Sequence, residues 1–132
     1  MHILSIDDSK TIRQAIQNLI EVIGVKFLEA EDGEKGLKVL EAVKGKVDLI
    51  LLDVEMPVMD GPQFLKIIKK DTRYQSIPVI MLTSVSQKEK VIDAIRAGAK
   101  QYITKPFSGE DLLAKIIQTV GIENLEKNTE FD

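Results

Sequence analysis

Short apolar runs divide the chain into regular segments. Three of them, at residues 3–6, 49–52 and 79–82, are almost entirely aliphatic. Each is too short for a stable helix, and near-continuous apolar character is typical of strands that are covered on both faces of a parallel sheet. Residues 25–31 and 100–104 are two weaker strand candidates. Their mixed polarity favours positions at the edges of the sheet.

Five segments of helical periodicity alternate with these runs. In the first, apolar residues recur at steps of three and four and form one stripe from Ile12 to Ile23. The other stripes run through residues 37–43, 64–68, 91–95 and 112–120. Five strands that alternate with five helices form a βα repeat, and such units wind right-handed into a parallel sheet with helices on both faces. We therefore predict an α/β fold with a doubly wound parallel sheet.

Helix start and stop signals agree with these segments. Asp60 with Gln63, and Ser86 with Glu89, have the spacing of a capping box, in which each side chain satisfies a free N–H of the first turn. Asp32 precedes a glycine in a turn that leads into an N-cap. Left-handed residues at helix C-termini are expected at two glycines, Gly98 and Gly121.

Composition narrows the class of protein. A length of 132 residues fits one domain. The apolar fraction is 44% but the aromatic fraction only 5%, so the core must consist mostly of aliphatic side chains. The chain contains no cysteine, which excludes disulfides, thiolate chemistry and a cysteine zinc site.

Charge and hydropathy predict where the protein acts. The net charge is −3 and acids alternate with bases, which argues against direct nucleic-acid binding. The N-terminus lacks the basic region of a signal peptide, and no apolar run approaches the roughly 20 residues that cross a bilayer. We expect a cytoplasmic protein without membrane insertion. Residues 1–120 are expected to form the domain and residues 121–132 a short acidic tail.

Chemically active residues follow the candidate strands directly. Asp7 and Asp8 end the first apolar run, and Asp53 ends the third strand in chain order. Thr83 ends the fourth, and Lys105 follows the fifth. Ligands in an open α/β sheet bind outside the carboxyl ends of the strands, so these five side chains should meet at one edge. A single Asp at such a position usually caps a helix or forms a turn, so the specificity lies in the combination.

This combination suits phosphoryl transfer. Mg²⁺ typically binds one or two carboxylates, several waters and phosphate oxygens. Phosphoryl transfer requires alignment of the reacting groups and stabilisation of charge on the phosphoryl oxygens, which a metal, an ammonium group and a hydroxyl can provide together. An ionised Asp is a competent acceptor and forms an acyl phosphate.

Taken together, the motifs resemble the receiver domain of two-component response regulators, most of all the stand-alone chemotaxis type, CheY. The resemblance covers about residues 2–120. The residues that carry it are Asp7-Asp8, Asp53-Val54-Glu55-Met56-Pro57, Asp60-Gly61, Thr83-Ser84, Tyr102 and Lys105-Pro106.

The resemblance implies a fold and a site. It implies a five-stranded parallel sheet of order 2-1-3-4-5 with five helices, and a cis peptide bond before Pro106. It implies that Asp53 accepts a phosphoryl group from the phosphohistidine of a sensor histidine kinase, and that Lys105 pairs first with Asp53 and then with the phosphoryl group. Mg²⁺ would be held by four residues: Asp8 and Asp53 through their carboxylates, Asp7 mainly through a bound water, and Glu55 through its backbone carbonyl.

The resemblance also implies a two-state switch. Phosphorylation would draw the Thr83 hydroxyl toward the site, and Tyr102 would turn inward. A surface formed by the fourth helix, fifth strand and fifth helix would then change shape for a downstream protein. Its expected members are Val91, Ile95, Tyr102, Leu112 and Lys115, although core packing explains the three aliphatic residues equally well. The protein would be a monomeric phosphoacceptor and not an enzyme in the usual sense.

Several other functions remain open. Chemotaxis is the preferred pathway, but a phosphorelay intermediate or a regulator of another signalling enzyme would use the same surface. A constitutive binding module without phosphorylation is the alternative of another class. A phosphohydrolase of the haloacid-dehalogenase type is disfavoured, because the first strand does not end in its Asp-x-Asp motif. A flavodoxin-like electron carrier is disfavoured because no phosphate-binding loop follows that strand.

Overall fold

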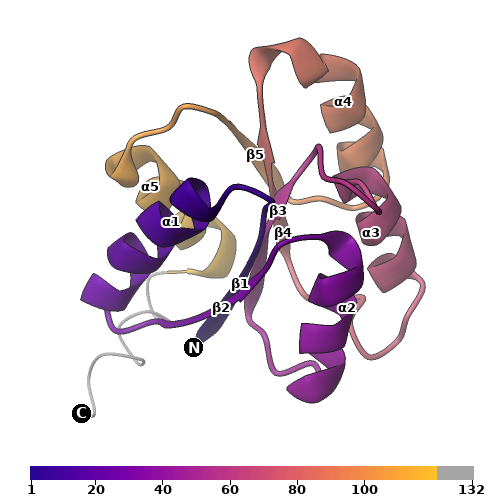
Figure 1. Cartoon of the computed structure of the whole chain (residues 1–132), viewed down its shortest axis with the longest axis horizontal. Helices are drawn as coiled ribbons and strands as arrows, with labels where there is room; N and C mark the ends of the chain where they lie inside the picture. Colours follow the sequence, from indigo (N-terminus) through magenta and orange to yellow (C-terminus); the bar gives the residue numbers. More distant parts are fainter. Residues whose placement is uncertain (122–132) are drawn as a thin grey trace.

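Five parallel strands form one sheet at the centre of the protein (Figure 1). The structure is a computed structural model that describes residues 1–121, without the side chain of Val85. The strands are β1 His2–Ile6, β2 Lys26–Ala30, β3 Leu49–Asp53, β4 Val79–Thr83 and β5 Gln101–Thr104. Their order in the sheet is β2-β1-β3-β4-β5, and all neighbours are parallel. The predicted doubly wound fold and strand order are confirmed.

Burial follows the position of each strand in the sheet. All residues of β3 and β4 are buried, whereas β2 and β5 at the two edges have only one buried residue each. Central strands of a parallel sheet are covered on both faces, which explains their continuous aliphatic sequence. The predicted edge positions of the two more polar strands are therefore confirmed.

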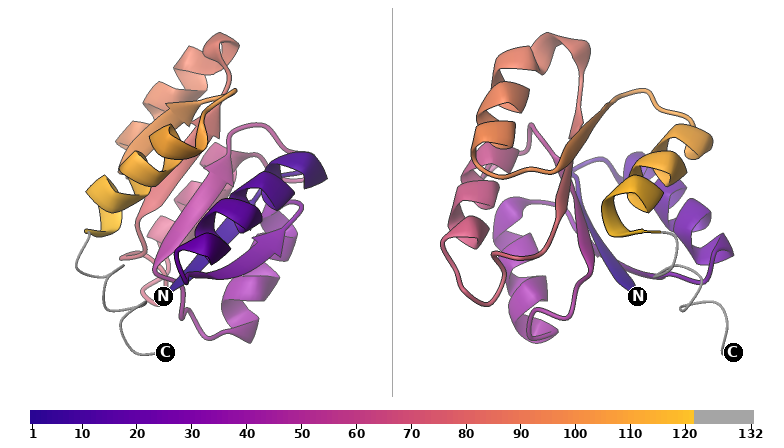
Figure 2. Two further views of the ribbon diagram at one scale, coloured as in Figure 1. Left: turned by 90° about the vertical axis from the view of Figure 1, so that its left-hand side faces the viewer. Right: turned by 180° about the vertical axis from the view of Figure 1, so that it is seen from behind.

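The helices cover the sheet in two layers. They are α1 Lys10–Val22, α2 Gly33–Ala42, α3 Gly61–Lys69, α4 Lys88–Arg96 and α5 Gly109–Val120. Figure 2 shows α1 and α5 on one face, with α2, α3 and α4 on the other. Side chains alternate along each strand, so Ile3 packs into the core beneath α1 and α5, while Leu4 packs into the core on the opposite face.

Caps fix most helix ends where the sequence predicts them. Asp60 and Gln63 form a reciprocal capping box at the start of α3, and Asp32 caps α2. Gly98 and Gly121 follow α4 and α5 with positive φ angles of 114° and 84°. These positions are confirmed.

The predicted capping box of Ser86 and Glu89 is wrong. A short 3₁₀ turn, Val85–Gln87, precedes α4, so Ser86 lies inside the turn and cannot cap the helix. Its hydroxyl instead lies 2.9 Å from that of Ser84. Gln87 occupies the N-cap position of α4 without a side-chain bond to the helix.

Two predictions concern the ends of the chain and the membrane. Apart from Gly121, the expected acidic tail lies outside the described residues, so a domain boundary near residue 120 remains a prediction. Within residues 1–121, none of the helices combines the length and apolar character required to cross a membrane.

One buried hydroxyl predicts a stabilising substitution. The Ser5 side chain is completely buried in β1, and its Oγ has no hydrogen-bond partner among the described residues. Removing a buried unsatisfied hydroxyl recovers its desolvation cost, so we expect Ser5→Ala to raise the free energy of unfolding by about 1 kcal/mol in urea denaturation.

A matched serine should respond in the opposite direction. The Ser108 side chain caps α5 by accepting a hydrogen bond from the Asp111 N–H at 3.0 Å. We expect Ser108→Ala to lower the free energy of unfolding by about 1 kcal/mol, because the loss of a cap leaves a helix N–H unsatisfied. Equal destabilisation by both substitutions would contradict the assignment of Ser5.

Candidate functional site

The carboxyl ends of four strands bring the predicted site residues together. Asp7 directly follows β1, and the register pairs Ile6 with Leu52, so Asp7 lies beside Asp53 at the end of β3. Thr83 ends β4 and pairs with Thr104, the residue before Lys105. β2 and β3 lie on opposite sides of β1, so the direction of strand order reverses at this point. Open α/β sheets bind their ligands at such a reversal.

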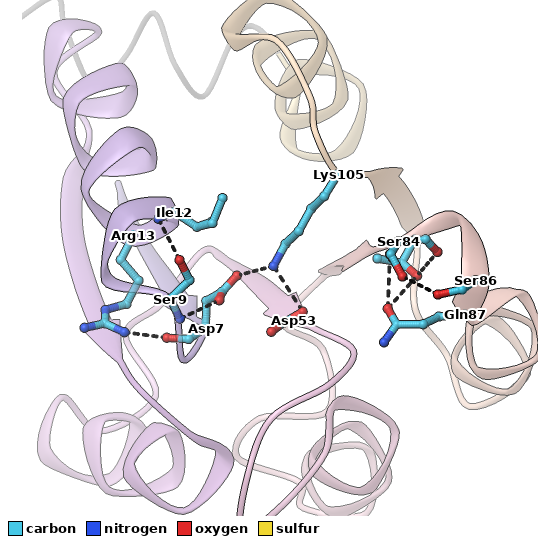
Figure 3. Close-up of polar contacts among 10 residues, drawn as sticks. Asp7, Ser9, Ile12, Arg13, Asp53, Ser84, Ser86, Gln87 and Lys105 are labelled. Atoms are coloured by element: carbon cyan, nitrogen blue, oxygen red, sulfur yellow. Dashed lines mark hydrogen bonds and ion pairs between the residues drawn. The ribbon is translucent and has the colours of Figure 1, made fainter.

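A lysine joins two of the acids. Lys105 Nζ lies 2.8 Å from Asp7 Oδ2 and 3.2 Å from Asp53 Oδ1 (Figure 3). Asp7 is completely buried, Asp53 is nearly so, and the side chain of Lys105 is 23% exposed. Close pairing of this kind balances part of the cost of burying two carboxylates. The bond between Lys105 and Pro106 is cis, as predicted.

Three carboxylates form a candidate metal site. Asp7, Asp8 and Asp53 each place one oxygen within 4.8 Å of the others, and Asp8 is the exposed member. Hard oxygen ligands at this spacing suit Mg²⁺. The Glu55 side chain is not part of the cluster, because its carboxylate lies 3.5 Å from Lys90 Nζ on α4. The residues present therefore fit the predicted metal, with only the backbone of Glu55 available for the role predicted for it.

Burial and neighbouring charges shift the pKa values of the site. Burial, followed by the nearby charge of Asp7, raises the pKa of Asp53 to about 6, in spite of the opposing effect of Lys105. Burial alone would lower the pKa of Lys105, but its hydrogen bonds and ion pairs with Asp7 and Asp53 outweigh burial and raise it. Lys105 is therefore positively charged at neutral pH. Asp53 is an anion at neutral pH, and any additional positive charge nearby would stabilise its ionised form.

The start of α3 packs directly behind Asp53. A Cβ added to Gly61 would lie 2.4 Å from the Asp53 carbonyl oxygen, so only glycine permits this close approach. The capping box of Asp60 and Gln63 holds the same turn. The backbone on which Asp53 sits is thus supported by α3.

The switch residues predicted from the resemblance lie at different depths. Thr83 is buried, and no hydrogen bond joins it to Asp53 among residues 1–121. Tyr102 is 48% exposed and lies on the edge strand β5. Thr83 therefore lies at the carboxylate end of the sheet, whereas Tyr102 faces outward.

An apolar groove lies beside Tyr102. Its volume is about 530 Å³, and its lining includes Val91 and Ile95 from α4. Ile95 is 43% exposed and Val91 only 8%. Leu112 lies on the buried face of α5 and is completely buried, so its predicted place on this surface is wrong and core packing is correct. Lys115 is half-buried and lies 3.4 Å from the Gln101 side chain.

Some contacts at the site were missed by sequence reasoning. The Arg13 guanidinium donates to the backbone carbonyl of Asp7 at 2.5 Å and to the Glu29 carboxylate at 2.7 Å. The Ser9 N–H donates to Asp7 Oδ1, and the side chain of Gln87 contacts Thr83. Only the Ser9 contact has a local signal, since a short Asp readily bonds the N–H two residues later.

Fold and site together define a class of signalling protein. A family model described as the response regulator receiver domain matches residues 3–117, and the chain belongs to this family. The predicted resemblance to receiver domains of the stand-alone CheY type is confirmed.

Individual relatives fit this assignment. Chemotaxis protein CheY1 of Helicobacter pylori is 36% identical over 122 residues, which cover 92% of this chain and 98% of the relative. Sensor histidine kinase CheAY of the same organism is also 36% identical, but this chain spans only 15% of its length. The structure of chemotaxis protein CheY4 of Vibrio cholerae superposes with a TM-score of 0.81 at 33% identity, covering 89% of this chain and 96% of the other.

One further structure contains a metal. The receiver domain of a sensor histidine kinase from Pseudomonas aeruginosa PAO1 has a magnesium ion coordinated in its active site cleft. It superposes with a TM-score of 0.81 at 24% identity and covers 91% of this chain and 97% of its own. At that identity the comparison supports the shared fold.

The raised pKa of Asp53 predicts that its contribution to the free energy of unfolding falls as the pH rises. The pKa of Asp53 is about 6 in the fold against an ordinary value of 3.8, so the folded state binds more protons between these values. The corresponding stability is present below about pH 4 and is lost as the pH rises through about 6. At about pH 7.5 without divalent cations, Asp53→Asn should exceed the wild type in free energy of unfolding by at least about 1 kcal/mol, the equivalent of roughly one pKa unit.

Urea denaturation across this pH range provides the measurement and its controls. The advantage of Asp53→Asn should vanish near pH 4 and shrink when Mg²⁺ is added, because the metal stabilises the wild type by binding its folded state. Asp71 is the matched control, since its hydrogen bonds with Arg73 lower its pKa. Asp71→Asn should give no stabilisation at about pH 7.5. An advantage of Asp53→Asn that does not change with pH would contradict the repulsion among the acids.

Proposed function

We propose that this receiver domain is a phosphorylation switch in which Asp53 accepts a phosphoryl group from the phosphohistidine of a sensor histidine kinase. The observation that carries the proposal is the contact of Lys105 with both Asp7 and Asp53 at the carboxyl ends of the strands. A purely structural ion pair would require one acid, whereas three lie together at this point. The proposed unit is the domain of residues 1–120.

The chemistry follows from the residues at this edge. An Asp53 carboxylate oxygen attacks phosphorus, the bond from phosphorus to the donor nitrogen breaks, and the imidazole leaves with the electron pair and takes up a proton. The product is an acyl phosphate on Asp53. Lys105 lies close enough to Asp53 to pair with the phosphoryl oxygens, where charge collects during the transfer. With a pKa of about 6, Asp53 is largely ionised at neutral pH and able to attack.

The acidic cluster is the proposed magnesium site. Asp8, Asp53 and the Glu55 backbone carbonyl would hold Mg²⁺, with Asp7 acting mainly through a bound water. Asp7 already accepts hydrogen bonds from Ser9 and Lys105, which supports an indirect role. When bound, Mg²⁺ neutralises part of the charge of the carboxylates and the phosphoryl oxygens. The magnesium-containing receiver from Pseudomonas aeruginosa supports this assignment by analogy of fold.

The proposed output is a change in the surface of α4, β5 and α5. Thr83 would donate to the phosphoryl group, Tyr102 would turn inward, and the groove beside Ile95 would change shape for a downstream protein. Phosphorylation would act by stabilising one of two pre-existing states, which is a shift in population. The outward Tyr102 and the exposed Ile95 are consistent with the unphosphorylated state of such a switch. We propose that the domain acts as a cytoplasmic monomer and not as an enzyme with an external substrate.

Chemotaxis signalling is the pathway that we favour. The chain aligns with nearly the full length of CheY1 of Helicobacter pylori, whose name assigns it to chemotaxis. A phosphorelay intermediate or a regulator of another signalling enzyme would use the same site and surface. A constitutive binding module would need neither the acids nor the lysine.

Phosphorylation by a small donor tests the proposal directly. We expect acetyl phosphate with Mg²⁺ to add one phosphoryl group to the protein, seen by intact mass, with acetate as the leaving group. Asp53→Asn should remove this gain, and omission of Mg²⁺ should reduce its rate at least about tenfold, the range of charge stabilisation expected for a metal at such a centre.

Lysine substitutions provide a matched comparison. Lys105→Met removes the ammonium from the site and should slow phosphorylation or weaken its coupling to the output surface. Lys46→Met is the control, because Lys46 is exposed and makes no ion pair among the described residues. If no phosphoryl group is added under any of these conditions, a constitutive interaction module becomes the better account.

A further inference from the structure

The Thr83 hydroxyl is already engaged in the structure. Thr83 Oγ1 lies 3.1 Å from the Ser84 carbonyl oxygen and 3.3 Å from Gln87 Oε1. Both acceptors belong to the segment between β4 and α4, and Figure 3 shows this group of residues apart from the carboxylate cluster. The hydroxyl is therefore directed toward the start of α4.

The neighbouring backbone fixes the orientation of the Gln87 amide. The Ser84 N–H lies 3.0 Å from Gln87 Oε1 and can only donate a hydrogen bond. The amide oxygen must therefore face Ser84 and Thr83, and the amide nitrogen must point away. Facing an oxygen that only accepts, Thr83 must be the donor.

A hydroxyl has one proton to donate. Phosphoryl oxygens on Asp53 would accept hydrogen bonds and have none to offer when ionised, so Thr83 could bind them only with that same proton. Binding the phosphoryl group therefore excludes donation to Gln87 and to the Ser84 carbonyl, which share this proton at 3.3 and 3.1 Å. Because Thr83 is buried, water does not readily replace either partner.

We infer that Gln87 is a positioning residue that holds the Thr83 hydroxyl in its unphosphorylated orientation, so that phosphorylation must break this contact. The inference rests on the proposed function and adds a residue that opposes the switch. Gln87 lies at the end of the 3₁₀ turn and at the N-cap of α4, yet its side chain does not cap that helix. Release of Thr83 therefore removes a contact between β4 and the N-cap residue of α4.

The position of Gln87 connects this contact to the output surface. Lys88 and Val91, one and four residues later, line the groove beside Tyr102 together with Thr83 and Ser84. A change at Gln87 thus reaches the groove through the first turn of α4. Breaking one hydrogen bond would alter both the partners of Thr83 and the attachment of this turn.

Two substitutions of Gln87 should act in opposite directions. Gln87→Met has a similar length but no acceptor, so the affinity for beryllofluoride with Mg²⁺, a mimic of the acyl phosphate, should rise about threefold to tenfold. Gln87→Glu keeps the acceptor and adds charge, which strengthens the bond from Thr83 and should weaken the affinity by a similar factor. Fluorescence or NMR titration measures both.

A double-mutant cycle separates positioning from other effects. Thr83→Val removes the hydroxyl at nearly constant shape, so substitutions of Gln87 should have little effect on beryllofluoride affinity in that background. Direct repulsion between Glu at position 87 and the anion would persist there. Gln75→Met and Gln75→Glu are matched controls, because Gln75 is exposed and precedes β4, whereas Thr83 and Gln87 lie at and beyond the other end of that strand. They should leave the affinity unchanged.

A second readout needs neither metal nor phosphoryl mimic. Three-bond couplings to the Thr83 methyl carbon report its χ1 rotamer by NMR in the metal-free protein. The wild type and Gln87→Glu should show one rotamer, and Gln87→Met should show averaging.

The outcomes distinguish this inference from the proposed function. Affinity changes of the same sign for both Gln87 substitutions, or changes that persist with Thr83→Val, would overturn the positioning role. An unchanged Thr83 rotamer in Gln87→Met would overturn it as well. If beryllofluoride fails to bind even the wild type, the proposed phosphorylation site is wrong, while the rotamer measurement still decides whether Gln87 holds Thr83.

Discussion

The site depends on one lysine that lies between two buried carboxylates. Lys105 is 98 residues from Asp7 and 52 from Asp53 along the chain, so the contact forms only when β1, β3 and β5 take their places in one sheet. Removing the ammonium would leave two buried carboxylates without their countercharge, which is strongly unfavourable. The order of the strands and the chemistry of the site therefore support each other.

The compensation is incomplete, and this imbalance gives the site its chemistry. One ammonium faces two carboxylates, while Asp8 contributes a third acid from an exposed position. The pKa of Asp53 remains raised to about 6 in spite of Lys105. A folded protein that retains this repulsion is less stable than it could be, but a divalent cation that bound at the cluster, as we propose, would stabilise it.

The β4–α4 connection joins the strand that ends near the acidic cluster to the helix that lines the groove. Thr83 closes β4 beside the cluster, and Tyr102 on β5 stands outward at the groove. Between them, the segment from Ser84 to Gln87 satisfies its polar groups locally, through the side chain of Gln87. In the switch that we propose, this connection would exchange these hydrogen bonds for a second set that includes the phosphoryl group.

The sequence alone determined the alternation of strands and helices, the central and edge strands, and the ends at which the acids, Thr83 and Lys105 collect. These features depend on periodicity and on residues next to strand ends, which are local properties of the chain. Only the tertiary structure decided that Leu112 packs inward while Ile95 stays exposed, that Ser86 lies inside a turn, and that Gln87 contacts Thr83. A helical stripe does not reveal how far packing covers it, and a polar side chain finds its partner only after the elements have packed in three dimensions.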